Sequence, residues 1–213
     1  MSNIQAILWD NDGVLVDSET VFFKITRCAF ARLGLELTEE IWATQYLGHG
    51  KGSKDIAECL GAHPAEINSV LKDRNEQYLI ALGQPPEIRP KVRETLATLY
   101  GRVRMAIVTG CPRKELNLMH EQSGLLEFFE TVLTADDYDD PKPSPAPYLA
   151  AVNALSLNAT NCIAVEDSRR GFSSAIAAGI ACMVVPTELT AMQDFSGSLA
   201  VEPDVSGILR YVE

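Results

Sequence analysis

The sequence has little positive charge and no long hydrophobic run, and both absences limit what the protein can bind. Lysine and arginine together number 18 against 29 aspartates and glutamates, which gives a net charge of −11. No basic cluster offsets this charge, so nucleic acid and anionic membranes are not expected as partners. No apolar run approaches the roughly 20 residues that span a bilayer, and the amino-terminal segment lacks the pattern of a signal peptide.

The sequence also lacks a cysteine framework. The five cysteines are an odd number, are scattered along the chain and show no CxxC spacing. This pattern is typical of reduced thiols and not of a disulfide framework or a zinc site. We therefore expect a cytoplasmic protein. We also expect a monomer or small homo-oligomer whose partner is a small molecule.

Short apolar runs rich in branched residues are present, and they predict buried strands. They lack polar alternation, as is typical of strands covered on both faces. The last four alternate with amphipathic segments of helical length, which predicts an α/β fold with a doubly wound, Rossmann-like parallel sheet. The predicted strands are Ala6–Trp9, Val103–Val108, Thr131–Thr134, Cys162–Val165 and Ala181–Val185, and the helices between the last four are Lys114–Ser123, Pro145–Leu155 and Arg170–Ala178.

A long segment between the first two predicted strands has helical patterns throughout. Apolar residues recur at helical spacing in Glu19–Leu33, and the sequence signals helix starts at Thr38 and Pro64. We predict a helical cap domain over residues 18–86, inserted into a core domain formed by residues 1–17 and 87–213. Such an insertion would lie over the carboxyl ends of the strands, where ligands bind in open α/β sheets.

Acidic residues gather where the first predicted strand ends. Asp10 follows the strand, Asp12 comes two residues later, and Gly13 lets the backbone turn. A divalent cation such as Mg²⁺ would balance these carboxylates, although Asp-x-Asp-Gly alone also fits a solvated acidic loop.

The other strand ends carry complementary groups. Thr109 and Gly110 follow the second strand, and a hydroxyl with flexible backbone N–H groups suits an anion. Lys142 is held between two prolines after the third strand, and Glu166-Asp167 end the fourth. Singly, these residues fit a helix cap, a solvated lysine and an acidic helix start. Together, at the carboxyl ends of consecutive strands, they predict a site for Mg²⁺ and an anionic substrate.

The motifs Asp10-Asn11-Asp12-Gly13, Thr109, Lys142-Pro143-x-Pro and Glu166-Asp167-Ser168, in this order and spacing, resemble those of the haloacid dehalogenase-like hydrolase superfamily. The inserted helices resemble the subgroup with phosphoglycolate phosphatase and β-phosphoglucomutase. The sequence departs from this pattern at Asn11, which is polar where the family has an apolar or aromatic residue, and at Pro90-Lys91, where Pro-Gly is typical.

The resemblance implies a Mg²⁺-dependent phosphatase that acts on a small phosphorylated metabolite. Asp10 would be the nucleophile and Asp12 the general acid and base. Thr109 and Lys142 would hold the phosphoryl oxygens. The metal ligands would be Asp10, Asp12 through its backbone carbonyl, Asp167 and, through water, Glu166. The acid at Asp12 favours phosphoryl transfer over dehalogenation, because a departing halide needs no proton.

Candidates for substrate contact are Gly110, the cap-turn residues His49 and Lys51, and Arg113; the last three also fit solvated side chains. Three other functions stay open. A phosphomutase would use the same two aspartates, and a catalytically silent binding protein would keep the fold. A signalling receiver domain also gathers acids, Thr and Lys around Mg²⁺. Its phosphorylated aspartate follows a later strand, however, and it lacks a helical insertion.

Overall fold

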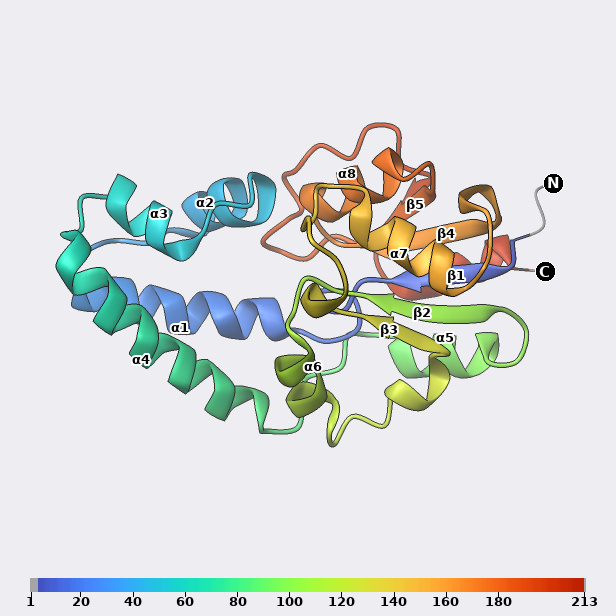
Figure 1. The fold of residues 1–213 in the computed structure, drawn as a ribbon, viewed down its shortest axis with the longest axis horizontal. Helices are drawn as coiled ribbons and strands as arrows, with labels where there is room; N and C mark the ends of the chain where they lie inside the picture. The colour runs from blue at the N-terminus through green and yellow to red at the C-terminus, as the bar shows by residue number, and fades with distance from the viewer. Residues whose placement is uncertain (1–3, 213) are drawn as a thin grey trace.

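The computed structural model describes residues 4–212, and within them an α/β core lies beside a body of helices (Figure 1). The core contains a six-stranded parallel sheet in the order β3-β2-β1-β4-β5-β6. The chain starts at the centre of the sheet, extends to one edge, and then returns to build the other half. The predicted doubly wound fold is therefore confirmed.

The strands follow the apolar runs of the sequence within a residue or two. One strand was missed, because a two-residue edge strand leaves no apolar run to detect. The strands are β1 (Ala6–Trp9), β2 (Arg104–Val108), β3 (Thr131–Leu133), β4 (Cys162–Glu166), β5 (Ala181–Val184) and the missed β6 (Ala200–Val201).

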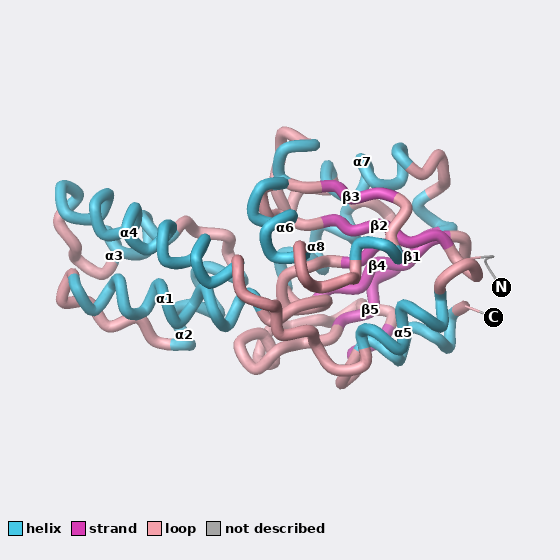
Figure 2. Tube along the Cα trace, turned by 90° about the horizontal axis from the view of Figure 1, so that it is seen from below, coloured by secondary structure: helices cyan, strands magenta, loops and turns pink. Residues whose placement is uncertain are grey.

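Helices cover both faces of the sheet (Figures 1 and 2). Alternate residues of β1 serve the two faces, as the period of a strand requires: Ile7 and Trp9 belong to one apolar cluster, and Ala6 and Leu8 to the other. The helices on the first face are α5 (Val92–Leu99) and α6 (Arg113–His120), and those on the second are α7 (Ala146–Ala154) and α8 (Arg169–Ala177).

The helical body is built on an antiparallel pair, α1 and α4, beside the sheet domain (Figure 1). Its own core is aromatic and aliphatic, with Phe30, Trp42 and Ile67 fully buried. The predicted helix starts are confirmed, since Thr38 caps α2 and Pro64 begins α4. The elements are α1 (Ser18–Arg32), α2 (Glu39–Ile41), a π-helical segment (Trp42–Gly48), α3 (Ser53–Cys59) and α4 (Pro64–Leu82).

The chain crosses between the two bodies twice, and the crossings pair with each other. The Asp17 N–H donates to the Glu87 carbonyl at 2.8 Å, and the Arg89 N–H donates to the Leu15 carbonyl at 3.0 Å. This pairing lies beside the predicted boundaries 17/18 and 86/87, and those boundaries remain a prediction. Lys91, close to the second crossing, has φ 64°, a left-handed conformation that favours glycine, so the departure from Pro-Gly leaves a strained residue there.

The topology brings the predicted site residues to one edge. Strand β1 lies between β2 and β4, so the carboxyl ends of these three strands are adjacent at the point where the direction of winding reverses. Asp10, Thr109 and Asp167 each follow one of these strands. No helix within residues 4–212 is long and apolar enough to cross a membrane.

Candidate active site

A tight loop after β1 carries the first two carboxylates. The Asp10 N–H donates to the Val165 carbonyl at 2.9 Å, which extends the pairing of β1 with β4 by one residue. Gly13 then turns the chain with φ 86°, and a Cβ there would meet Asp167 Oδ2 at 2.3 Å. Glycine is therefore required at this position both by the backbone conformation and by the close approach of Asp167.

Three buried carboxylates converge at this edge of the sheet. Asp10, Glu166 and Asp167 each offer an oxygen atom within 4.8 Å of the other two. Asp167 Oδ2 and Glu166 Oε2 are buried and have no hydrogen-bond partner among residues 4–212. Burying ionised carboxylates costs free energy unless they are paired or bind a metal. This cluster therefore needs positive charge close to its carboxylates.

Lys142 provides one such charge and uses all three of its N–H donors. Its Nζ lies 2.8 Å from Asp10 Oδ1, 2.7 Å from Glu166 Oε1 and 2.8 Å from the Val108 carbonyl oxygen. Three ionised carboxylates against one ammonium group leave two negative charges uncompensated. That remainder, together with an all-oxygen donor set, matches a divalent hard cation such as Mg²⁺.

The pKa values of the cluster express the same imbalance. Burial, followed by the charge of Glu166, raises the pKa of Asp10 to about 7, although Lys142 opposes the shift. Burial and the charge of Asp10 also raise the pKa of Asp167 well above its ordinary value. Burial alone would lower the pKa of Lys142, but the charges of Asp10 and Glu166 outweigh it and raise that pKa. Lys142 thus stays protonated, whereas Asp10 and Asp167 hold a proton to higher pH than ordinary aspartates do.

Asp12 is held by two hydroxyl groups instead of a cation. Ser18 Oγ donates to Asp12 Oδ1, and Thr109 Oγ1 donates to Asp12 Oδ2 at 2.9 Å. Thr109 Oγ1 in turn accepts from the Cys111 N–H at 3.0 Å. These contacts fix the carboxyl group of Asp12 at the start of the cap helix α1.

A cavity of about 400 Å³ opens above these groups, a volume within the range of small-molecule sites. The core contributes Asp10, Asp12, Lys142, Asp167 and Arg170 to its walls.

The cap helices contribute Glu19, Phe22, Tyr46, Asn75 and Tyr78 to the same cavity. The cavity therefore lies between the two bodies. A substrate held at the carboxylates would contact the cap with its remaining atoms.

Comparison with known proteins agrees with this arrangement. Residues 7–185 match the family model described as haloacid dehalogenase-like hydrolase. The chain belongs to this family. The protein CbbY of Rhodobacter capsulatus is 32% identical over 219 residues, covering 95% of this chain and 94% of the relative. A putative phosphatase, YhcW, of Bacillus subtilis is 28% identical, covering 88% of this chain and 86% of the relative.

Solved structures share the fold across the whole chain. A putative phosphoglycolate phosphatase from Lactobacillus plantarum has a TM-score of 0.82 at 20% identity, covering 98% of this chain and 99% of its own. CbbY from Rhodobacter sphaeroides, in complex with xylulose 1,5-bisphosphate, has a TM-score of 0.79 at 22% identity and covers 99% of both chains. The predicted family, and with it an enzyme of the hydrolase class, is confirmed.

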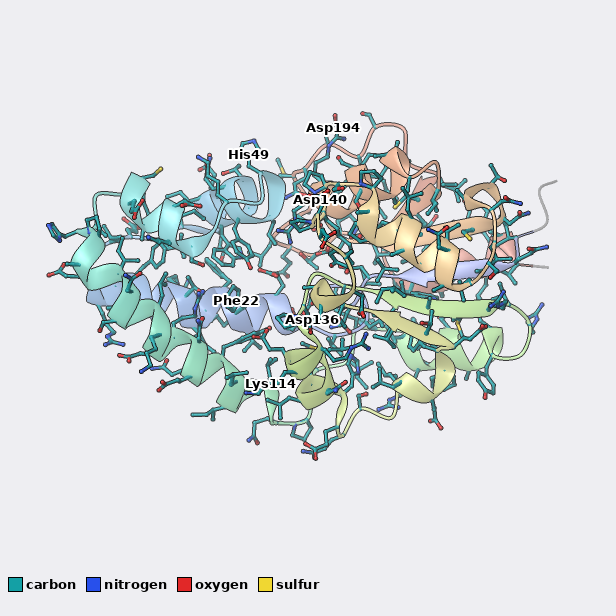
Figure 3. The ribbon with its side chains drawn as sticks, viewed as in Figure 1. Phe22, His49, Lys114, Asp136, Asp140 and Asp194 are labelled. Atoms are coloured by element: carbon teal, nitrogen blue, oxygen red, sulfur yellow. The ribbon has the colours of Figure 1, made fainter. Side chains whose placement is uncertain are left out.

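The predicted substrate contacts divide into two groups in this haloacid dehalogenase-like hydrolase. Gly110 lines the cavity, but His49 and Lys51 line two other, separate hollows. In Figure 3, His49 lies at the end of the cap beside the core, apart from the labelled Phe22 on α1, and its hollow is shared with Arg169 and Asp194 of the core. Arg113 is turned toward β3, with its guanidinium 2.5 Å from Asp137 and 2.7 Å from the Val132 carbonyl oxygen. Their contact with a substrate remains a prediction.

The structure also defines positions that the sequence left open. Asp17 caps α1 by accepting from the Thr20 N–H at 3.3 Å. Glu19, by contrast, faces the cavity and accepts from Trp42 Nε1 at 2.8 Å. Burial raises the pKa of Glu19 to about 7. Trp42 is fully buried in the cap, while Tyr46 stacks on it and forms part of the cavity wall.

Two supporting contacts were missed by sequence reasoning. Tyr148, from α7, donates to Glu166 Oε1 at 2.6 Å. A Cβ at Gly171 would lie 1.9 Å from Glu166 Oε2, so the first turn of α8 closes over this carboxylate only because residue 171 is glycine. A glycine five residues after Glu166 could have indicated close packing of the next helix on this carboxylate. Nothing near Tyr148 in the sequence indicates its partner.

Asn11 has a structural explanation. Its side-chain oxygen lies 2.7 Å from His120 Nε2, and His120 Nδ1 lies 2.8 Å from Ser123 Oγ. Burial lowers the pKa of His120 to about 4, so the ring is neutral at physiological pH. The polar residue between the two catalytic candidates is thus matched by a buried polar partner on α6.

Proposed function

We propose that the protein is a Mg²⁺-dependent phosphatase that hydrolyses a small phosphorylated metabolite through an aspartyl-phosphate on Asp10. The observation that carries this proposal is the cluster of Asp10, Glu166 and Asp167 around Lys142, with Asp12 beside it in the same cavity. Within one site these residues combine a nucleophile, a cation site, a fixed positive charge and a second carboxyl group for proton transfer.

The residues present fit a magnesium ion. Asp167 Oδ2 is buried without a partner, and the donors are carboxylate oxygens, the ligands that Mg²⁺ prefers. Asp10, Asp167 and the backbone carbonyl of Asp12 would hold the ion, with Glu166 reaching it through water. When bound, the ion would supply positive charge that keeps Asp10 ionised and stabilises the charge of the phosphoryl group.

The side chains divide the reaction into two steps. An oxygen of Asp10 attacks phosphorus, the ester P–O bond breaks, and the leaving oxygen takes a proton from Asp12. Asp12 then removes a proton from water, the water oxygen attacks the same phosphorus, and the bond to Asp10 breaks to release inorganic phosphate. Lys142 stays next to Asp10 throughout and offsets the charge that develops on the phosphoryl oxygens.

The hydroxyl groups of Ser18 and Thr109 support the role of Asp12. Both donate to its carboxylate, which fixes the side chain in the wall of the cavity that Asp10 also lines. Thr109 directs its own hydrogen to Asp12 in this structure, so its predicted contact with a phosphoryl oxygen would need the hydroxyl to rotate.

The size of the cavity and the named relatives support the substrate class. A volume of about 400 Å³ suits a metabolite of a few carbons. Relatives include a phosphoglycolate phosphatase of Yersinia pestis and a phosphorylated carbohydrates phosphatase of Thermotoga maritima. The phosphomutase alternative would use the same Asp10 and Asp12, and differs only in returning the phosphoryl group to a sugar instead of water.

Phosphate release from a panel of phosphorylated metabolites, with Mg²⁺ and with a chelator, tests the proposal. Release that requires Mg²⁺ and is lost in Asp10→Asn is expected. Asp140→Asn is the matched control, because Asp140 is an exposed carboxylate in the same region that does not line the cavity (Figure 3). No release, with conversion of a sugar 1-phosphate to its 6-phosphate, would indicate the mutase. If neither phosphatase nor mutase activity is found, catalysis is refuted and the silent binding protein is favoured.

A further inference from the structure

Arg170 is a second cation of the active-site cavity, and it forms no ion pair among residues 4–212. It lies in the first turn of α8, three residues after Asp167, and lines the cavity. Among residues 4–212, no carboxylate lies within ion-pair distance of its guanidinium. Its Nε is buried and has no hydrogen-bond partner in that part of the chain. A buried N–H without an acceptor is destabilising, so this position is not explained by the fold alone.

The neighbouring cations differ from Arg170 in this respect. Lys142 has all three donors engaged by protein oxygens, so it offers none to a distant part of a substrate. Arg169, one residue earlier, points away from the cavity, where its Nη1 donates to the Asp194 carbonyl at 2.6 Å and its guanidinium lies 5.4 Å from the ring centre of Phe172. The two adjacent arginines therefore have separate roles.

The surroundings of Arg170 keep its guanidinium at the joint between core and cap. The guanidinium carbon lies 5.9 Å from the ring centre of Tyr46. A Cβ at Gly50, in the cap turn, would come within 3.3 Å of Arg170 Cδ. Glu19, an acidic group of the cap that lines the same cavity, already accepts from Trp42. The side chain is thus enclosed by the cap turn while its donors remain available to the cavity.

We propose that Arg170 binds a second anionic group of the substrate, so that the preferred substrate is a phosphate monoester that also carries a carboxylate or a second phosphate. This inference rests on the proposed phosphatase function. Five carboxylates line the cavity, from Asp10, Asp12, Glu19, Glu115 and Asp167, and they would repel a second anion unless a local cation receives it. A guanidinium offers a planar fork of donors that matches carboxylate and phosphate oxygens.

Matched pairs of substrates test the assignment, with phosphate release as the readout. One pair is 3-phosphoglycerate and glycerol 3-phosphate, which differ in the carboxylate. The other is fructose 1,6-bisphosphate and fructose 6-phosphate, which differ in the second phosphate. The wild-type enzyme should favour the member with the extra anion in at least one pair, and the pair that shows this preference identifies the anion.

Arg170→Met should lower that preference about 10- to 100-fold, chiefly by raising KM, because a charge-assisted bidentate contact has this weight. Arg170→Lys, which keeps the charge but not the fork, should restore part of the preference. Arg169→Met removes the same charge outside the cavity and should leave the preference unchanged. The unfolding midpoint of each variant shows whether it is folded.

Several results would overturn the inference. Equal losses on both members of a pair in Arg170→Met, or the same effect in Arg169→Met, would show that Arg170 only supports the fold. A wild-type enzyme that hydrolyses p-nitrophenyl phosphate but favours the singly anionic members would refute the second anion while leaving the phosphatase intact. A wild-type enzyme that hydrolyses none of the probes would refute the proposed function, and the substrate inference would fall with it.

Discussion

Replacing Lys142 by methionine is expected to destabilise the metal-free protein by about 3–5 kcal/mol near neutral pH, because it leaves buried carboxylates without their charge partner. Lys142 is 8% exposed and contacts Asp10 and Glu166 directly. Methionine has a similar length and is apolar, so the change removes the charge and the three donors while filling most of the same space.

The expected size follows from the geometry of the cluster. The carboxylate oxygens lie within 4.8 Å of one another, and at an effective dielectric constant of about 20 two unit charges at that separation repel by about 3.5 kcal/mol. Without Lys142, the protein must either bear this repulsion or keep a further proton on the cluster. Taking up a proton at about pH 7.5 against an ordinary aspartate pKa near 4 costs about 5 kcal/mol, which limits the loss.

Urea unfolding followed by circular dichroism, in a chelator and again with excess Mg²⁺, measures this loss. Lys114→Met is the matched control, because Lys114 is an exposed lysine on α6 that points away from the site (Figure 3). The loss in Lys142→Met should shrink at about pH 5, where Asp10, whose pKa is raised to about 7, is protonated in the folded state. It should also shrink with Mg²⁺ if the ion binds the folded carboxylates as proposed. A loss equal to that of Lys114→Met, or one that is the same at both pH values and with Mg²⁺, would refute the charge balance described for this site.

Three further outcomes are expected. Asp10→Asn should reduce turnover at least about 1,000-fold yet raise the unfolding free energy of the metal-free protein, because one of three clustered carboxylates is gone; lower stability would contradict this. The gain in stability from Mg²⁺ should increase from about pH 5 to pH 8, as protons leave the ligands, and a gain independent of pH in urea unfolding would exclude these carboxylates as ligands. Burial lowers the pKa of His120 to about 4 in the folded protein, whereas the unfolded chain binds this proton with a pKa of about 6.5. Stability is therefore full above about pH 6.5 and is lost as the pH falls through 4. His120→Gln should therefore lose about 3 kcal/mol less than the wild type between pH 7 and pH 4, and equal losses would show that His120 does not titrate on unfolding.

The convergence of Asp10, Thr109 and Asp167 could be predicted from the sequence because each of them directly follows a strand. In a parallel sheet, the residues after adjacent strands meet at one edge whatever the side-chain details. Asp10, Thr109 and Asp167 follow β1, β2 and β4, and these three strands are neighbours. The order of strands in a doubly wound sheet was therefore sufficient to place them together.

The substrate side of the cavity could not be predicted in the same way, since helices of the cap place residues by rotation and tilt. His49 and Lys51 were chosen for their chemistry in a glycine-rich turn, but the π-helical segment before them directs both into other hollows. Glu19 and Tyr46, which were not among the predicted substrate contacts, line the cavity instead. A shift of one residue in a helix changes the direction of a side chain by about 100°, and sequence patterns do not fix helix boundaries that closely.

The first turn of α8 connects the chemistry of the core to the position of the cap. Asp167 of the carboxylate cluster immediately precedes this turn, and Arg170 within it faces the cavity. Gln193 accepts from the Arg169 N–H at 2.6 Å and donates to the Ala43 carbonyl of the cap at 2.9 Å. A movement of the cap would thus alter contacts on the turn that follows the proposed metal ligand Asp167 and contains Arg170, the proposed substrate cation. The cap also contacts Asp12 through the hydroxyl group of Ser18. In the proposed mechanism, the position of the cap would therefore decide whether water reaches the Asp12 carboxyl group, and hence whether hydrolysis prevails over transfer to a second alcohol.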